Sequence, residues 1–222
     1  MGEHIELTAA DGFTLQAYRA EPEGAPRGGI VVVQEIFGVN QHIREVTDGY
    51  AAQGYVAIAP AIFDRAEPGF EVGYDDDGRQ AGITIAMGAD RQLFVADVAA
   101  AVAEAAAAGS VGVVGYCLGG TVAYASAVHV DGVAAAVGYY GGQVYDMREM
   151  APKCPTMLHF GSQDAGIPME KVEAVVADRP EVEVHVYDAD HGFNCDHRSS
   201  YSADASAAAL ERTLAFFAEH VG

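Results

Sequence analysis

Basic residues are scarce in this sequence. Only 12 of its 222 residues are Lys or Arg, against 32 Asp or Glu, which leaves a formal net charge of −20 at pH 7. Binding to nucleic acid or to an anionic membrane surface depends on clustered Lys and Arg that neutralise phosphate groups. The composition therefore argues against both roles. It also raises the question of how so acidic a protein could hold an anionic substrate.

Cysteine and long apolar runs are scarce as well. Three cysteines, Cys117, Cys154 and Cys195, are too few and odd in number for a disulfide framework. Charged or turn-forming residues interrupt every apolar run before it reaches the length of a membrane span. The N-terminal segment has no basic stretch followed by an apolar one, so we expect no signal peptide. These features predict a cytoplasmic protein without a membrane segment, either a monomer or a small homo-oligomer.

Short apolar runs alternate with helical patterns along the chain. Hydrophobic residues make up 50% of the sequence, which is enough for one α/β domain over residues 1–222. Several runs consist of Val, Ile and Ala without interruption, as do parallel strands that helices cover on both faces. The alternation predicts an α/β fold with a mostly parallel central sheet and helices on both faces.

The expected elements begin with a hairpin of His4–Leu7 and Thr14–Tyr18. The expected strands that follow are Gly29–Gln34, Tyr55–Ala59, Ser110–Gly115, Val133–Tyr139, Thr156–Phe160 and Val182–Tyr187. The expected helices are 40–53, with Asn40 as N-cap and Gly54 just past its end, 90–108, 118–128, 168–177 and 201–220. We expect the Gly- and Asp-rich stretch 61–88 to be irregular and to form a loop or cap over a site. In this architecture sites lie at the carboxyl ends of strands.

One of these strand ends carries a nucleophile-like turn. The run Val113-Val114-Gly115-Tyr116-Cys117-Leu118-Gly119-Gly120 predicts a strand, a sharp turn and a helix. Glycines two positions before and two after Cys117 match a nucleophile elbow, where strand and helix pass too closely for side chains. The N-terminal end of the helix favours a thiolate and an oxyanion there. Taken alone, a buried structural cysteine in a tight turn explains the segment equally well.

Two further strand ends supply the partners that such a nucleophile needs. Asp164 follows the strand 156–160, and His191 follows the strand 182–187. Nucleophile, acid and histidine thus occur in the order that α/β-hydrolases use. We predict that Cys117 attacks an acyl carbon, His191 transfers the proton and Asp164 orients the imidazole. The backbone N–H of Leu118 is the expected oxyanion donor, and activated esters, thioesters or lactones suit a thiol nucleophile better than amides do.

These segments together resemble the dienelactone hydrolase (carboxymethylenebutenolidase) family of the α/β-hydrolase fold, over essentially the whole chain. The likeness rests on Gln34-Glu35-Ile36-Phe37-Gly38-Val39-Asn40, Gly115-Tyr116-Cys117-Leu118-Gly119-Gly120, Gly138-Tyr139-Tyr140-Gly141, Asp164 and His191-Gly192-Phe193. The resemblance implies that Glu35 sits by the nucleophile and takes part in thiolate formation when substrate binds. It also implies that the N–H of Ile36 is a second oxyanion donor. A capping or surface role for Glu35 before the helix 40–53 is the alternative.

The resemblance is weaker in the substrate pocket. The family holds its substrate's carboxylate with two arginines and a tyrosine, and Arg79 matches one of the arginines. The tyrosine position falls near Ile83 and the second arginine position on Cys195, and neither side chain can supply that contact. Arg198 and Arg65 are candidate replacements. Candidates for the pocket wall are Phe37 and Tyr140.

Metal and cofactor binding are not expected. His191, Cys195, Asp196 and His197 crowd together in the sequence, but structural zinc normally uses two separated ligand pairs. No second Cys/His pair is evident, so we expect no metal and no cofactor.

The sequence therefore predicts a hydrolase that opens a lactone or cleaves a small ester through a Cys117 thioester, with dienelactone as the leading substrate. A broader carboxylesterase or thioesterase with the same groups is the first alternative. A hydrolase-like protein that binds a ligand or senses thiol redox state, without catalysis, is the second. The incomplete set of carboxylate-binding residues and the acidic charge both count against dienelactone, but they leave lactone or ester hydrolysis untouched.

Overall fold

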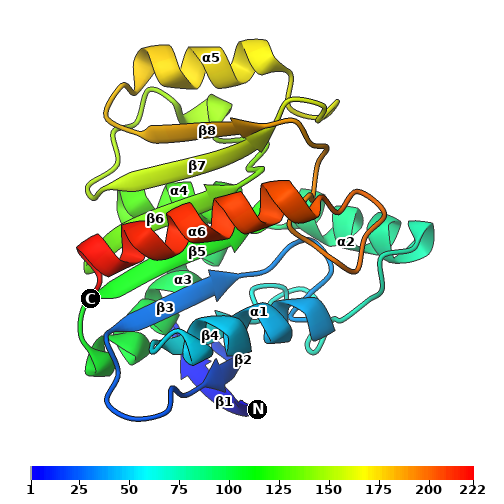
Figure 1. The fold of residues 1–222 in the computed structure, drawn as a ribbon. Helices are drawn as coiled ribbons and strands as arrows, with labels where there is room; N and C mark the ends of the chain where they lie inside the picture. Colours follow the sequence, from blue (N-terminus) through cyan, green and yellow to red (C-terminus); the bar gives the residue numbers. More distant parts are fainter. Residues whose placement is uncertain (1) are drawn as a thin grey trace.

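The computed structural model describes residues 2–222, and a central sheet of eight strands organises them (Figure 1). The strands are β1 (Glu3–Thr8), β2 (Thr14–Ala20), β3 (Gly29–Val33), β4 (Val56–Pro60), β5 (Val111–Tyr116), β6 (Val133–Tyr139), β7 (Thr156–Gly161) and β8 (Glu183–Tyr187). Their order across the sheet is β1-β2-β4-β3-β5-β6-β7-β8. The strands β1 and β2 pair antiparallel with each other, and β2 pairs antiparallel with β4. Strands β3 to β8 are mutually parallel.

Helices cover both faces of this sheet. They are α1 (Gln41–Ala52), α2 (Asp76–Gly88), α3 (Arg91–Ala105), α4 (Leu118–His129), α5 (Met169–Asp178) and α6 (Ala203–His220), with short 3₁₀ turns at Ala106–Ala108 and Tyr145–Met147. Figure 1 shows α1 and α6 on the near face and α3 and α4 behind it. Two apolar cores follow from this arrangement. Tyr50 of α1 and Phe217 of α6 are buried in one core, and Phe94 of α3 and Val122 of α4 are buried in the other. The predicted α/β-hydrolase-type architecture is confirmed.

The central strands are buried along their whole length, as expected of a sheet covered on both faces. Every residue of β3, β4, β5 and β7 is buried. The predicted strand and helix boundaries agree with the structure to within one or two residues, except in helix 90–108, which continues from α3 into a 3₁₀ turn. Asn40 caps α1 as predicted, because its side chain accepts a hydrogen bond of 3.2 Å from the N–H of Ile43. No helix within residues 2–222 is both long and apolar enough to cross a membrane.

The prediction of irregular structure over 61–88 was wrong for its second half, which forms α2. Asp75 begins this helix, since its side chain accepts a hydrogen bond of 2.7 Å from the N–H of Gly78. Glycines within the stretch suggested a loop because glycine weakens a helix. Gly82 has a packing reason instead: a Cβ at this position would overlap the carbonyl oxygen of Ile36. The glycine lets α2 lie directly against the loop that follows β3.

Candidate active site

The turn between β5 and α4 holds Cys117 in a conformation that side chains rarely adopt. Its φ of 54° and ψ of −114° lie outside the regions of ordinary helix and strand. A Cβ at Gly115 would overlap the carbonyl oxygen of Gly119, and a Cβ at Gly119 would overlap that of Val33. The two glycines therefore let strand and helix approach closely enough to form the sharp turn. This turn projects Cys117 at the carboxyl end of the sheet, where it is partly exposed.

Asp164 and His191 lie together at the neighbouring strand ends. Nδ1 of His191 is 2.6 Å from Oδ2 of Asp164, and Oδ1 of Asp164 accepts a hydrogen bond of 2.8 Å from the N–H of Gly166. The Asp164 side chain is only 2% exposed, whereas that of His191 is 27% exposed. Asp164 is thus fixed in the interior and contacts Nδ1 of the imidazole. This contact leaves Nε2 as the ring nitrogen that can transfer a proton at the cavity.

The environment of His191 favours its protonated form. Burial by itself would lower the pKa of His191, but the negative charge of Cys117 as a thiolate and the hydrogen bond to Asp164 outweigh it. The net effect raises the pKa of His191 to about 10. Cys117 and His191 line the same cavity, so these two side chains and Asp164 are grouped at one edge of the sheet.

The two residues predicted to donate to an oxyanion, Leu118 and Ile36, both line the cavity at Cys117. Leu118 is the first residue of α4, so its N–H has no acceptor within the helix. Ile36 lies in the loop after β3, and it lines the same cavity as Cys117 and Leu118. The two predicted donor residues therefore come to the cavity at Cys117 from two different strand ends.

Glu35 is fully buried beside this site, and both of its carboxylate oxygens are occupied. Oε1 accepts a hydrogen bond of 3.1 Å from Nη1 of Arg198, and Oε2 accepts one of 3.1 Å from the hydroxyl of Tyr74. The negative charges of Glu35 and Cys117 raise the pKa of Arg198 above its usual value, although burial acts in the opposite direction. Arg198 therefore compensates the charge of Glu35, with which it pairs directly at 3.1 Å. The alternative of a surface or capping role for Glu35 is wrong, because the side chain is 1% exposed and Asn40 caps α1.

The aromatic candidates Tyr140 and Phe37 occupy different places. Tyr140 is buried with a φ of 40°, and its ring centroid is 5.0 Å from that of His191. Burial and the nearby charges of Glu35, Cys195 and Cys117 raise its pKa well above the usual value, so its hydroxyl stays protonated. Phe37 is buried against Tyr74, with ring centroids 4.5 Å apart, and the Arg198 guanidinium lies 5.8 Å from its ring centre. Phe37 thus supports Arg198 rather than the wall of the cavity.

A cavity of about 500 Å³ opens at Cys117 and His191. Its lining includes the apolar side chains of Ile83 and Met87 from α2, so this segment covers the site as the sequence suggested. Apart from Cys117 and His191, the ionisable side chains in the lining are those of Arg91, Asp146 and Lys171. Neither cation makes an ion pair within residues 2–222.

The arginines considered from the sequence lie in three different environments. Arg79 is on α2 outside this lining, with its side chain 58% exposed and 3.8 Å from Asp76. Arg65 is paired with Asp97 and Asp11 at 2.8 Å and 2.7 Å, so the suggestion that it replaces a family arginine was wrong. Arg198 reaches the site, as its contact with Glu35 shows. Tyr74, Arg91 and Lys171 were missed, because only the tertiary structure brings them to the site.

Comparisons with known proteins identify the family and the fold. Residues 15–221 match the model of the dienelactone hydrolase family. The chain is 36% identical over 229 residues to a carboxymethylenebutenolidase from Pseudomonas putida, covering 97% of this chain and 96% of that protein. A carboxymethylenebutenolidase from Pseudomonas sp. is 34% identical over 224 residues, 96% of this chain and 93% of that protein. The crystal structure of a protein from Klebsiella pneumoniae superposes on this chain with a TM-score of 0.85 at 30% sequence identity. The superposition covers 99% of this chain and 100% of that protein's chain.

Proposed function

The chain belongs to the dienelactone hydrolase family, and from this premise we propose that it opens a lactone or cleaves a small activated ester through a thioester on Cys117. The observation that carries the proposal is the arrangement of three groups at adjacent strand ends: a strained Cys117 beside His191, whose Nδ1 is 2.6 Å from Asp164. This is the set of roles that covalent acyl transfer needs: nucleophile, proton carrier and orienting carboxylate.

The proposed reaction has two halves. The thiol proton of Cys117 moves to His191, Sγ attacks the acyl carbon of the substrate, and the N–H groups of Leu118 and Ile36 donate to the oxyanion that forms. The intermediate collapses to a thioester when His191 gives its proton to the leaving alkoxide. Water then attacks the thioester with His191 as base, which releases the acid and restores the thiol. In a lactone, the leaving alkoxide and the acid belong to one product molecule.

Glu35 is proposed to control the charge of the nucleophile. Its buried carboxylate is held by Arg198 and Tyr74 in the loop after β3, next to Ile36, which lines the cavity at Cys117. A carboxylate at this place disfavours a thiolate in the absence of substrate and can accept the thiol proton. Arg198 offsets part of this repulsion.

The cavity supports a small substrate with an apolar part and an anionic part. Ile83 and Met87 offer an apolar surface, and Arg91 and Lys171 offer positive charge. The net charge of −20 repels an anionic substrate. Arg91 and Lys171, which make no ion pair within residues 2–222, attract such a substrate locally at the cavity. We propose that they hold the carboxylate of a substrate, the part that the resemblance assigned to Arg79.

A panel of three substrates tests the proposed function. We expect the wild-type protein to hydrolyse a dienelactone and p-nitrophenyl acetate, and to act more slowly on a simple acyl thioester, because the first two have better leaving groups. Initial rates measured by absorbance distinguish the alternatives. Ester turnover without lactone turnover favours a broader carboxylesterase, and no turnover of any of the three contradicts the enzymatic proposal for these classes.

Arg91→Ala and Lys171→Ala test the anionic subsite. Each is expected to raise KM for the carboxylate-bearing dienelactone by roughly three- to tenfold, because each removes one charged contact to the carboxylate. The KM for neutral p-nitrophenyl acetate is expected to stay unchanged. Arg79→Ala is the matched control, since it removes an equal charge from outside the cavity lining. If only Arg79→Ala raises KM for the dienelactone, then Arg79 binds the carboxylate, and Arg91 and Lys171 do not.

A further inference from the structure

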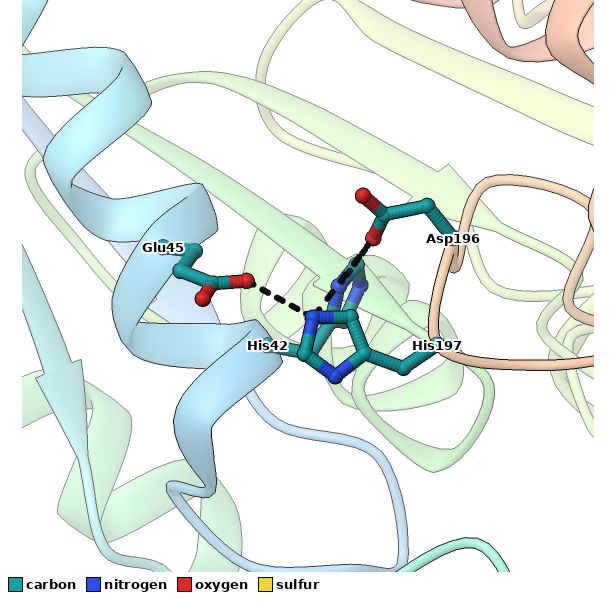
Figure 2. A group of neighbouring side chains, drawn as sticks. All are labelled: His42, Glu45, Asp196 and His197. Carbon is teal, nitrogen blue, oxygen red and sulfur yellow. Dashed lines mark hydrogen bonds and ion pairs between the residues drawn. The ribbon is translucent and has the colours of Figure 1, made fainter.

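Four metal-ligating side chains from distant parts of the chain meet beside α1. His42 and Glu45 are separated by three positions on this helix and therefore share one face of it. Asp196 and His197 come from the loop that follows His191 (Figure 2). One ligand atom from each of the four lies within 4.8 Å of the others. We refer to His42, Glu45, Asp196 and His197 as the four-ligand cluster.

The spacing within the four-ligand cluster suits one small ion. Four ligand atoms about 2.1 Å from a tetrahedral metal lie about 3.4 Å from one another. Nδ1 of His42 is 3.3 Å from Oδ1 of Asp196, and the same oxygen is 3.8 Å from Nε2 of His197. Nε2 of His197 is 2.8 Å from Oε2 of Glu45. Rotations of exposed side chains would bring these values to the spacing that a bound ion needs.

The chemistry of the ligands also fits a metal. The His42 side chain is only 4% exposed, so the surrounding protein holds its imidazole in place. Imidazole nitrogen is a common ligand of zinc-type ions in proteins. Nδ1 of His42 is the ring nitrogen that faces the cluster, 3.3 Å from Oδ1 of Asp196. Two carboxylates opposite supply the negative charge that balances a divalent ion.

An ion can also reach this place. The side chains of Asp196, Glu45 and His197 are 61%, 48% and 31% exposed. His42, Glu45 and Asp196 line a cavity of about 310 Å³ that is separate from the cavity at Cys117. The cluster combines one buried, preformed ligand with three accessible ones.

We propose that the four-ligand cluster binds a divalent transition-metal ion of the zinc type. Two imidazoles and two carboxylates suit Zn²⁺, whereas Mg²⁺ and Ca²⁺ prefer sites made of oxygen alone. Four protein ligands leave no open position on a tetrahedral ion, so the metal is structural. It ties α1 to the loop after His191, which carries Arg198 to its contact with Glu35. The site does not depend on the proposed hydrolase activity.

The expectation of no metal rested on the lack of a second ligand pair in the sequence. His191 and Cys195, which seemed to belong with Asp196 and His197, are not among the four ligands. His42 and Glu45 supply the second pair from about 150 positions earlier in the chain. Their spacing on a helix was the signal available in the sequence, although it gains meaning only when the loop lies beside that helix.

Calorimetric titration of Zn²⁺ into untagged, chelator-treated protein tests the proposal. The titration uses the Cys117→Ala chain as the parent, because a catalytic thiol beside a histidine is itself a zinc ligand. We expect one Zn²⁺ per chain, a Tm that rises with Zn²⁺ concentration, and the intense visible absorption of four-coordinate Co²⁺ when cobalt replaces zinc. His197→Ala and Glu45→Gln, both accessible positions, are each expected to weaken the Kd by at least about tenfold and to remove the rise in Tm.

His185→Gln is the matched control, because His185 pairs with a single carboxylate, Glu183, at 2.6 Å. It is expected to leave the Kd for Zn²⁺ within about twofold of the parent. Circular dichroism of each variant verifies that the fold is intact. The proposal is overturned if the parent binds Zn²⁺ more weakly than about 1 mM, or if both cluster variants keep the parent's Kd.

Discussion

Cys117→Ala is expected to lower kcat/KM for p-nitrophenyl acetate and for a dienelactone by at least about 10³-fold. Without Sγ no thioester can form, and only the oxyanion donors and the binding cavity remain. The turn itself should survive, because alanine keeps the Cβ that Cys117 already places there. Steady-state rates on both substrates measure the loss, and mass spectrometry of the wild-type protein mixed with ester detects the covalent acyl group.

Two other cysteines provide controls for this loss. Cys195→Ala removes a fully buried thiol near Glu35 and Tyr74, and Cys154→Ala removes a half-buried thiol elsewhere in the fold. Neither variant is expected to change the acylated mass or to lower kcat/KM by more than about tenfold. Full activity in Cys117→Ala, or an acyl group found on another cysteine, contradicts the proposed nucleophile.

Asp164→Asn is expected to lower kcat by about 10³-fold or more while leaving the fold intact. The amide is nearly the same size as the carboxylate, but it carries no charge to stabilise the imidazolium and favours a different imidazole tautomer. The pKa of His191, about 10 in the intact site, should fall, because a neighbouring carboxylate favours the protonated ring. Titration of the imidazole signals by NMR follows the pKa, and steady-state kinetics follow kcat.

Asp190→Asn is the control for Asp164→Asn. The Asp190 side chain accepts a hydrogen bond of 2.6 Å from the backbone N–H of His191 rather than from its ring. We expect kcat to fall by no more than about threefold in this variant, with the pKa of His191 unchanged. An unchanged His191 pKa in Asp164→Asn would mean that the short contact to Asp164 does not govern the imidazole.

The framework and the three central site residues could be predicted from the sequence because their signals are local. Continuous apolar runs mark strands β3, β4 and β5, and the carboxyl ends of parallel strands meet at one edge of the sheet. A residue directly after such a strand is therefore placed to within a few ångströms by the strand alone. Cys117 directly follows β5, whereas Asp164 and His191 lie three and four residues after β7 and β8, and all three are at that edge.

Other parts of the site could not be predicted because their positions depend on packing between distant segments. From the sequence alone, Gly82 argues against a helix. In the structure, its lack of a side chain lets α2 pack against the backbone of Ile36. Arg198 reaches Glu35 from 163 positions away, and Lys171 reaches the cavity from α5, which the sequence did not connect with substrate. Such contacts are fixed by how helices and loops cover the sheet edge, and no local pattern encodes them.

The backbone of Cys117 has a consequence for how this protein can change over time. A non-glycine residue at a φ of 54° and a ψ of −114° costs the folded state on the order of 1–3 kcal/mol, so the nucleophile is held in place at the expense of stability. Glycine at this position would relieve the strain and remove the chemistry. Mutations that strengthen the fold are therefore easiest to accumulate away from this turn, and any lineage that loses selection for activity should lose Cys117 early.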